Sequence, residues 1–465
     1  MRRLSTGSKD LDLIMDGGLP IGSLVVLAGA PGTGKSILAQ QMCFTNAANG
    51  GKAIYYSTLS ESHSKVLNYL EQFSFFDSNA IGNGVWLNSL SSMLDDGLSA
   101  VATEILRAAR DEEASLVVVD SAKVIRGSAD EDDFRRFMYE VASLFAHTES
   151  VLLFVGEYTP QELESSTEFS IADGIVQLAN EPKGAFDERW LRVLKMRGSA
   201  HLGGRHSLEI GSNGIRVFPR LEATATMNAP AAQRRTSIGV PELDQLMGGG
   251  MREGDTTLVM GPSGAGKTTL ALRFIAQGLS EGERCLYVSF QENEDQLALK
   301  ADSFGWEFNS ARKDGRLTLC HLAPVELNLD RVSDLVLSEL ASGPTRRVVI
   351  DSLAELEFAA SHTTRLPGYT WKLAKLIRSA GASLIVTNEA ASVGLPLAGS
   401  VSDHAFLFHN VLLLRYFELE SEMRRALHVL KMRDSSHDKA ALQFEVDEAG
   451  FHILQRLKSV GGVLG

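Results

Sequence analysis

The sequence predicts an α/β protein made of two copies of one domain, each a mostly parallel β-sheet flanked by helices with an antiparallel extension at one edge. Three observations predict this fold. The 465-residue chain repeats itself after about 230 residues, short apolar runs alternate with amphipathic segments, and a glycine-rich loop follows the first apolar run of each copy.

The repeat begins near the N-terminus of each copy. STGSKDLDLIMDGGLPIGSLVVLAGAPGTGKS starts at Ser5 and TSIGVPELDQLMGGGMREGDTTLVMGPSGAGKT starts at Thr236, so that Lys35 corresponds to Lys267. The stretch 219–235 is rich in small residues, holds two prolines and lacks apolar periodicity, which is typical of a linker. We therefore expect a first domain at 1–218, a linker at 219–235 and a second domain at 236–465.

Each copy alternates predicted strands and helices. Runs rich in branched residues are typical of buried parallel strands, and apolar residues three and four apart favour helices, as in DDFRRFMYEVASLFAHT at 132–148 and YTWKLAKLIRSAG at 369–381. The last part of each copy changes to successive strands, which predicts the antiparallel extension. The predicted parallel strands are LVVLAG at 24–29, AIYYST at 53–58, LVVVD at 116–120, VLLFVG at 151–156, TLVMG at 257–261, CLYVSF at 285–290, VVID at 348–351 and SLIVTN at 383–388.

Composition narrows the class of protein. Hydrophobic residues make up 44% and charged residues 22% of the chain, as in soluble globular proteins. Cys43, Cys285 and Cys320 lack metal-ligand spacing, and no window reaches the ~18 apolar residues of a membrane span. We expect a cytoplasmic protein with no membrane partner. Its net charge of −13 also makes nucleic acid an unlikely partner.

Two phosphate-binding loops follow the first predicted strand of each copy. GAPGTGKS and GPSGAGKT both match G-x-x-x-x-G-K-[ST], in which backbone N–H groups and the lysine bind phosphates and the hydroxyl binds Mg²⁺. Each loop lies between a strand and a helix, which is the context that the motif requires. We expect ATP and Mg²⁺ at both loops, bound by Gly29, Gly32, Thr33, Gly34, Lys35 and Ser36 in the first copy and by Gly261, Gly264, Ala265, Gly266, Lys267 and Thr268 in the second.

Asp120 and Asp351 each end an apolar strand. A carboxylate at that edge of a parallel sheet can orient Mg²⁺ through water, so the expected metal residues are Ser36, Asp120, Thr268 and Asp351. The alternative is an aspartate that caps the following turn.

The chain resembles the KaiC-like group of RecA-fold ATPases that carry two ATPase domains in tandem. The resemblance covers nearly the whole chain. It implies two tandem RecA-like P-loop NTPase domains. The residues that carry it are the leader GSKDLDLIMDGGLPIG, both phosphate loops, VSFQEN at 288–293, VVIDSLAEL at 348–356, LLLRYFELESEMRRALHVLKMRDSSHD at 412–438 and the two K-x-R motifs in LKMRGSAH and LKMRDSSH.

In proteins of this family, ATP lies between adjacent subunits of a hexameric ring. The resemblance implies that Lys195 and Arg197, and Lys431 and Arg433, reach the phosphates of the neighbouring subunit. Alternation along a strand predicts that both side chains of each pair share a face. The alternative is a solvated cationic strand face. Gly198 of the first copy is replaced by Asp434 in the second, which places an acid beside the second pair.

The family usually has paired glutamates after the second strand, of which the first polarises the attacking water. The corresponding pairs here are Ser60 with Glu61 and Gln291 with Glu292. Serine and glutamine cannot accept a proton near neutral pH, so we expect hydrolysis to be slow or to depend on Glu61 and Glu292. The alternative role of those glutamates is a charge at a helix N-terminus.

The clock protein of the family also phosphorylates adjacent Ser and Thr residues near its second ATP site. Without gaps, those positions fall on Ala405 and Phe406, which have no hydroxyl, so autokinase activity is doubtful. Ser400 and Ser402 are the nearest alternative acceptors.

The expected function is that of a slowly hydrolysing hexameric ATPase that acts as a nucleotide-dependent switch for signalling protein partners. A RecA- or RadA-like DNA-dependent ATPase is one alternative, although residues 158–182 and 388–410, where recombinases carry DNA-facing loops, contain no Lys or Arg. A nucleotide-locked scaffold with negligible turnover is the other.

Overall fold

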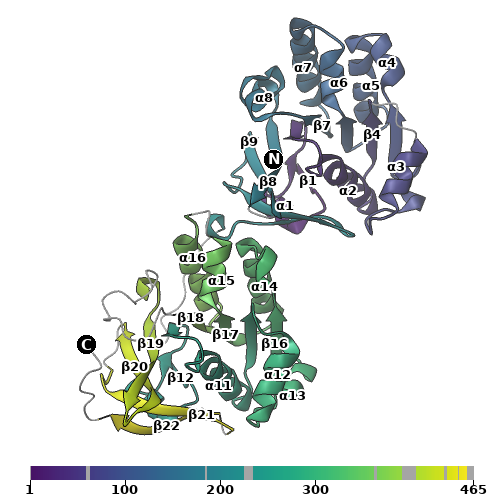
Figure 1. The fold of residues 1–465 in the computed structure, drawn as a ribbon. Helices are drawn as coiled ribbons and strands as arrows, with labels where there is room; N and C mark the ends of the chain where they lie inside the picture. The colour runs from purple at the N-terminus through teal and green to yellow at the C-terminus, as the bar shows by residue number, and fades with distance from the viewer. Residues whose placement is uncertain are drawn as a thin grey trace. The chain divides into compact units, whose positions relative to one another are not determined.

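The structure is a computed structural model that describes residues 2–58, 63–183, 186–224, 234–360, 364–389, 405–433, 437–448 and 450–457. The chain forms two compact units, Met1–Thr224 and Ala225–Gly465 (Figure 1). The division falls within the predicted linker, whose bounds at 219–235 stay a prediction.

The first unit alternates strands and helices up to residue 171 and then forms successive strands. Its elements are β1 (Arg3–Leu4), α1 (Lys9–Ile14), β2 (Leu19–Pro20), β3 (Leu24–Gly29), α2 (Lys35–Ala48), β4 (Ala53–Ser57), α3 (His63–Leu70), η1 (Ser78–Ala80), β5 (Val85–Ser89), α4 (Ser91–Asp95), α5 (Leu98–Arg110), β6 (Leu116–Asp120), α6 (Ala122–Gly127), α7 (Glu131–Phe145), β7 (Val151–Glu157), α8 (Pro160–Ser165), α9 (Thr167–Ile171), β8 (Gly174–Lys183), β9 (Phe186–Met196), β10 (His206–Gly211), β11 (Gly214–Phe218) and η2 (Leu221–Ala223).

The second unit repeats this order. Its elements are β12 (Arg235–Thr236), α10 (Pro241–Leu246), β13 (Met251–Arg252), β14 (Thr256–Gly261), α11 (Lys267–Ser280), β15 (Arg284–Ser289), α12 (Glu294–Ser303), α13 (Phe308–Lys313), β16 (Leu317–His321), η3 (Pro324–Glu326), α14 (Leu329–Ser342), β17 (Thr345–Asp351), α15 (Leu353–Ala359), α16 (Leu366–Ser379), β18 (Ser383–Glu389), η5 (Ala405–Leu407), β19 (Asn410–Leu419), β20 (Glu422–Met432), β21 (Ala441–Asp447) and β22 (Gly450–Leu457).

Both units contain a nine-stranded sheet with the same topology. The orders are β11-β10-β9-β8-β3-β7-β6-β4-β5 and β16-β15-β17-β18-β14-β19-β20-β21-β22. Six strands of each sheet are parallel, and the three strands beyond β8 or β19 are antiparallel. The sheets confirm the predicted α/β fold with its antiparallel edge extension.

Helices cover both faces of the first sheet because the side chains of its strands alternate between two buried cores. Val25 and Leu27 of β3 pack in a core with α2, whereas Val26 and Ala28 pack in a second core with α5 and α7. In Figure 1, α2 and the α5–α7 group accordingly flank the sheet of this unit. Burial on both faces explains why β3 reads as one continuous apolar run.

The eight predicted parallel strands all form; seven match their predicted bounds within one residue, and β17 begins three residues before the predicted start at Val348. The predicted helices also form, as α7 and α16. Asp130 caps α7 by accepting a hydrogen bond from the backbone N–H of Asp133, and Glu131 to Asp133 place acids near its positive end. The edge strands β5 and β16 were not predicted, because their mixed apolar and polar residues give a weak strand signal. Among the described residues, no helix combines the length and the apolar content needed to cross a membrane.

Candidate functional site

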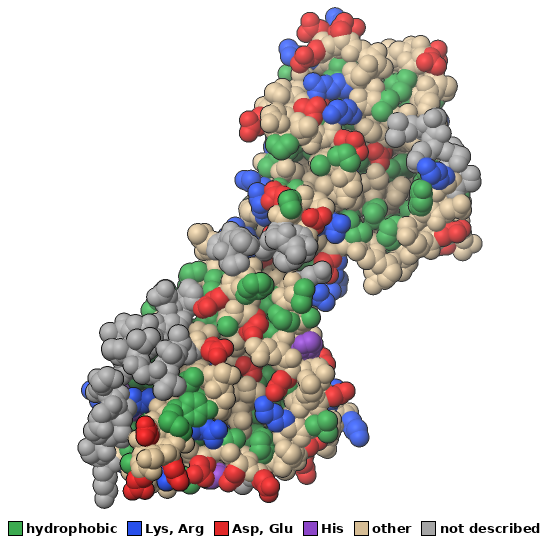
Figure 2. Space-filling view, viewed as in Figure 1, with side chains coloured by type: hydrophobic (Ala, Val, Ile, Leu, Met, Phe, Trp, Pro, Cys, Tyr) green, Lys and Arg blue, Asp and Glu red, His purple; other side chains and the backbone are tan. Residues whose placement is uncertain are grey.

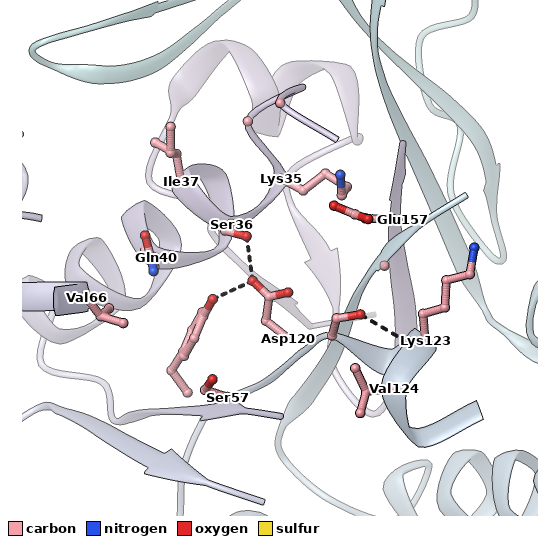
Figure 3. Close-up of a pocket in the computed structure, with 15 residues that line it drawn as sticks. Lys35, Ser36, Ile37, Gln40, Ser57, Val66, Asp120, Lys123, Val124 and Glu157 are labelled. Carbon is pink, nitrogen blue, oxygen red and sulfur yellow. Dashed lines mark hydrogen bonds between the residues drawn. The ribbon is translucent and has the colours of Figure 1, made fainter. Parts of the chain in front are cut away.

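The first phosphate loop connects β3 to α2 at the carboxyl edge of the parallel strands (Figure 3). Gly34 lies just before α2 with a φ of 97°, a conformation that favours glycine, and a Cβ there would lie 2.8 Å from Ile210 Cδ1. The loop can therefore hold its tight turn only with a residue that lacks a side chain. After this turn α2 begins, and the backbone N–H groups of its first turn point toward the cavity at the loop.

Lys35 is buried in this loop and donates a hydrogen bond from Nζ to the carbonyl oxygen of Ala30, at 2.8 Å. Burial lowers the pKa of Lys35, while the nearby charges of Glu157 and Asp120 raise it. Figure 3 shows the ammonium beside the carboxylate of Glu157. A desolvated ammonium with few charged partners is well suited to bind an incoming anion such as a phosphate.

Ser36 and Asp120 meet beside the loop. The hydroxyl groups of Ser36 and Tyr55 each donate to Oδ2 of Asp120, both at 2.6 Å. Figure 3 marks the contact between Ser36 and Asp120. Burial raises the pKa of Asp120, and the two hydroxyl hydrogen bonds oppose that rise. Mg²⁺ prefers oxygen ligands such as a hydroxyl and a carboxylate, and a cation would also offset the unfavourable burial of the carboxylate charge. These residues therefore fit Mg²⁺. They surround a cavity of about 570 Å³ that Lys35, Glu157 and Lys123 also line.

The second site repeats these contacts. Lys267 Nζ donates to the carbonyl oxygens of Gly261 and Pro262, both at 2.9 Å, and burial lowers the pKa of Lys267. Thr268 Oγ1 and Tyr287 Oη donate to Oδ2 of Asp351 at 2.9 and 2.7 Å. Thr387 donates to the other oxygen of Asp351. The cavity at this loop has a volume of about 330 Å³.

Gln291 and Glu292 line the second cavity together with Glu389 and Arg425. Glu292 Oε1 forms an ion pair with Lys300 Nζ at 3.1 Å, whereas Gln291 Nε2 donates to Glu355 Oε1 at 2.5 Å. Glu292 therefore lines the cavity with a cationic partner, and its role as a proton acceptor stays a prediction. Ser60, Glu61 and Asp434 lie outside the described residues.

The lysine and arginine pairs lie at the end of the antiparallel extension. Lys195 Nζ donates to the carbonyl oxygens of Phe169 and Ser170 at 3.2 and 3.1 Å, and Arg197 pairs with Asp173 at 3.1 Å. Arg197 also reaches the carbonyl oxygen of Ser170, so the two cations share one side of the chain there.

The second pair has the same arrangement. Lys431 Nζ donates to the carbonyl oxygens of Ala405 and Phe408 at 3.2 and 2.8 Å, and Arg433 donates to that of Phe406. Neither pair lines the cavity at its own phosphate loop.

Two kinds of site residue were missed by sequence reasoning. Glu157 and Glu389 end the strands beside the two phosphate loops, opposite Gly29 and Gly261 in the register. Tyr55 and Tyr287 bind the two aspartates. Both kinds occupy equivalent positions of the repeat, and comparison of the copies residue by residue could have identified them.

Comparison with known proteins agrees with this geometry. A family model described as "ATPase: KaiC" matches residues 4–222 and 236–458. The chain belongs to the KaiC ATPase family. It is 28% identical to the circadian clock oscillator protein KaiC of Thermostichus vulcanus, over 100% of this chain and 91% of that protein. It is 27% identical to the circadian clock protein KaiC3 of a Synechocystis strain, over 100% of this chain and 94% of that protein.

Membership in the KaiC family makes the chain an ATP-binding protein with two tandem RecA-like domains and supports ATPase activity at the level of the family. The match covers both phosphate loops and both lysine and arginine pairs. The roles of individual residues rest on the geometry and are proposals.

Proposed function

We propose that this protein is a slowly hydrolysing, Mg²⁺-dependent ATPase that forms a homohexameric ring and acts as a nucleotide-dependent switch for a signalling protein partner. The observation that carries the proposal is that each lysine and arginine pair lies at the opposite sheet edge from the phosphate loop of its own domain. A pair so placed can meet a nucleotide only outside its own domain, and in this proposal that nucleotide belongs to another copy of the chain.

The strand register gives the size of this separation. Lys195 is opposite Ile175, which is in turn opposite Val26, three residues before the loop begins at Gly29. Three residues of strand span about 10 Å, and two further strand spacings of ~5 Å separate β9 from β3. Lys431 has the same placement through Val411 and Leu258. A head-to-tail ring brings this edge of one subunit to the loop edge of the next.

The residues of one subunit would bind and orient the triphosphate. Lys35 and Lys267 neutralise phosphate charge, and the N-termini of α2 and α11 supply N–H donors. Ser36 with Asp120, and Thr268 with Asp351, would hold Mg²⁺, which supplies further charge neutralisation when bound. The neighbouring cations Arg197 and Arg433 would stabilise negative charge that develops on the transferred phosphoryl group.

The absence of a carboxylate at positions 60 and 291 supports slow turnover. A ring that hydrolyses slowly spends long periods in one nucleotide state, as a switch requires. The named relatives are clock proteins, but Ala405 and Phe406 carry no hydroxyl, so autophosphorylation at these positions is not part of the proposal. We also propose a cytoplasmic location, because the sequence has few cysteines and no apolar window as long as a membrane span.

Charge argues against DNA as the partner. Acidic and basic side chains are interspersed on the described surface of both units that Figure 2 shows. Of the acids in the segment after β7, Glu162 pairs with Lys123 and Glu168 with Arg126. Such a surface gives a polyanion little net attraction.

Assembly is the direct test. Because a ligand that binds only the ring stabilises it, light scattering should show hexamers with ATP and Mg²⁺ and smaller species without them. Lys35→Ala should weaken the ring more than Lys267→Ala, since the first domain is proposed to be the assembly ring. A monomer whose mass does not change with nucleotide would contradict the proposal.

A further inference from the structure

The contact between Gln291 and Glu355 in the second site joins two residue types that the sequence of the first copy lacks at the corresponding positions. Gln291 follows β15 and lines the cavity at the second phosphate loop, and Glu355 lies in the first turn of α15. The same cavity is lined by Lys267, Asp351 and Ser352. An inference about this pair rests on the proposed ATPase function and concerns how the second site positions water.

The hydrogen bonds of Glu355 fix which way the amide of Gln291 faces. Glu355 Oε1 accepts from Gln291 Nε2 at 2.5 Å, and Glu355 Oε2 accepts from the backbone N–H and the hydroxyl of Ser352 at 3.2 and 2.6 Å. An ionised carboxylate can only accept, so the amide must present its nitrogen to Glu355. The carbonyl oxygen of Gln291 then faces away from Glu355 and is available as an acceptor in the cavity.

Ser352 in turn holds Glu355 in place. The serine caps α15 and Glu355 completes a capping box with it, so the carboxylate is anchored to the turn that follows Asp351. The chain of contacts therefore runs from the strand that carries Asp351 to the amide of Gln291. A long glutamine side chain loses conformational freedom in this arrangement, which is the requirement for positioning a reactant.

The first site lacks both members of the pair. Since Ser121 corresponds to Ser352 in the repeat, Val124 occupies the position of Glu355. Ser57 and Ser289 end the equivalent strands β4 and β15 opposite the two aspartates, so the position of Gln291 corresponds to Leu59 in the sequence. Val124 lines the first cavity with an apolar side chain. The glutamate thus occurs in the copy that has a long amide to orient and not in the copy that has a leucine at that position.

We propose that Glu355 is a positioning residue that holds the amide of Gln291 so that its carbonyl oxygen orients the water that attacks ATP in the second site. The water oxygen bonds to the γ-phosphorus as the bond from that phosphorus to the β,γ-bridging oxygen breaks. The bonding electron pair leaves with ADP, and a water proton passes to a phosphate oxygen. Gln291 accepts a hydrogen bond from the water but takes no proton.

Glu355 is not itself the proton acceptor in this proposal. Both of its oxygens already accept hydrogen bonds, and Glu355 does not line the cavity. Its effect reaches the reaction through Gln291, which predicts a defect in turnover with little change in nucleotide affinity.

The first experiment compares Glu355→Ala with Glu357→Ala in the full chain. Glu357 lies on the same helix but two residues further on, so its side chain projects from a different face. Turnover by the second domain is measured as the difference between the ATPase rate with an intact second loop and the rate of the Lys267→Ala variant. Glu355→Ala should lower the kcat of that component by roughly 10-fold to 100-fold with KM and the affinity for a fluorescent ATP analogue nearly unchanged. Glu357→Ala should lower neither.

Conservative variants separate positioning from simple support of the helix. Glu355→Gln keeps a carbonyl that can accept from Gln291, whereas Glu355→Asp is one methylene too short to reach it. The glutamine variant should therefore retain more turnover than the aspartate variant, although both side chains have an oxygen that can accept a hydrogen bond from Ser352. The reverse order would contradict the proposal.

A reciprocal exchange tests the contact itself. Gln291→Glu alone sets two carboxylates against each other and should gain little turnover, because like charges at this distance disfavour a productive geometry. Gln291→Glu with Glu355→Gln restores the hydrogen bond and adds a proton acceptor, so it should turn over faster than either single variant. Additive effects of the two changes would show that the residues act independently and would overturn the inference.

The two levels of failure are distinguishable. Wild-type protein that binds no ATP, or hydrolyses none, contradicts the proposed function. Wild-type protein whose second domain hydrolyses ATP at a rate unaffected by Glu355→Ala contradicts only the positioning role.

Discussion

Lys35 and Lys267 are each buried in a phosphate loop and hydrogen-bonded to loop carbonyl oxygens. Glu157 and Glu389 provide nearby negative charge, but burial has the larger effect and lowers the pKa of both lysines. The loop therefore holds its ammonium at a cost, and a bound phosphate would supply counter-charge. Ligand affinity and stability of the nucleotide-free loop are coupled through one side chain.

This coupling predicts a pH dependence of stability. Because the folded-state pKa of each lysine lies below its ordinary value of 10.5, the unfolded chain binds more protons between the two values. The contribution of the lysines to stability should therefore rise as pH increases toward 10.5. We expect Lys35→Met with Lys267→Met to flatten the alkaline rise of the unfolding temperature in nucleotide-free protein. Equal slopes for wild type and variant in calorimetry would refute this expectation.

Saturating ATP with Mg²⁺ provides the control for that measurement. Bound phosphates favour the charged ammonium, so the alkaline rise should also diminish in wild-type protein with nucleotide. The methionine variant should show no such effect of nucleotide.

At the scale of elements, the antiparallel strands decide where the lysine and arginine pairs go. Because β9 runs against β8, its end returns to the amino edge of the parallel strands, away from the phosphate loop. β20 does the same beside β19. The reversal of direction in each hairpin thus places the lysine and arginine pair at the sheet edge opposite the phosphate loop.

Mixed assemblies test this arrangement. Chains with Lys267→Ala lack a working second loop, and chains with Arg433→Ala lack the cation offered to a neighbour. The two variants are mixed in equal amounts, dissociated by removal of nucleotide and reassembled into rings. For head-to-tail contacts, about one quarter of the interfaces should then regain second-site activity. The measured quantity is ATPase activity above that of each variant alone.

A chain that carries both substitutions is the matched control. Mixed with an equal amount of wild type, it should give a similar level of second-site activity, because one quarter of its interfaces also join two intact parts. No recovery in the mixture of single variants, with ring formation intact, would mean that each chain uses its own arginine.

For the whole molecule, charge and duplication are the dominant features. A net charge of −13 on 465 residues repels polyanions at long range, whatever single basic residues do locally. The two copies share a sheet order and a phosphate loop but differ beside that loop, where only the second has Gln291 and Glu355. We therefore expect the copies to bind the same nucleotide and to process it at different rates.

The charge predicts an ATPase that does not respond to nucleic acid. Addition of single-stranded or double-stranded DNA at low salt should change turnover by less than about twofold, and fluorescence anisotropy should detect no salt-sensitive binding. Strong stimulation by DNA would instead support the recombinase-like alternative. Inorganic polyphosphate serves as a control for effects of a polyanion in general.

The sequence by itself determined the fold class, the duplication and the phosphate loops. These features depend on local patterns: apolar runs for buried strands, helical periodicity, and a spacing of glycines, lysine and hydroxyl that is contiguous in the chain. It also led to Asp120 and Asp351, since each ends a recognisable strand. The exact domain bounds and the roles of the site residues stay predictions.

Only the tertiary structure decided which distant residues meet. Tyr55 joins Asp120 across 65 positions, and Gln291 joins Glu355 across 64, because neighbouring strands β4 and β6, and β15 and β17, end at the same sheet edge. Strand order is set by packing of whole elements and leaves no local trace in the sequence. For the same reason the distance of Lys195 and Lys431 from their own phosphate loops became visible only when the sheet was assembled.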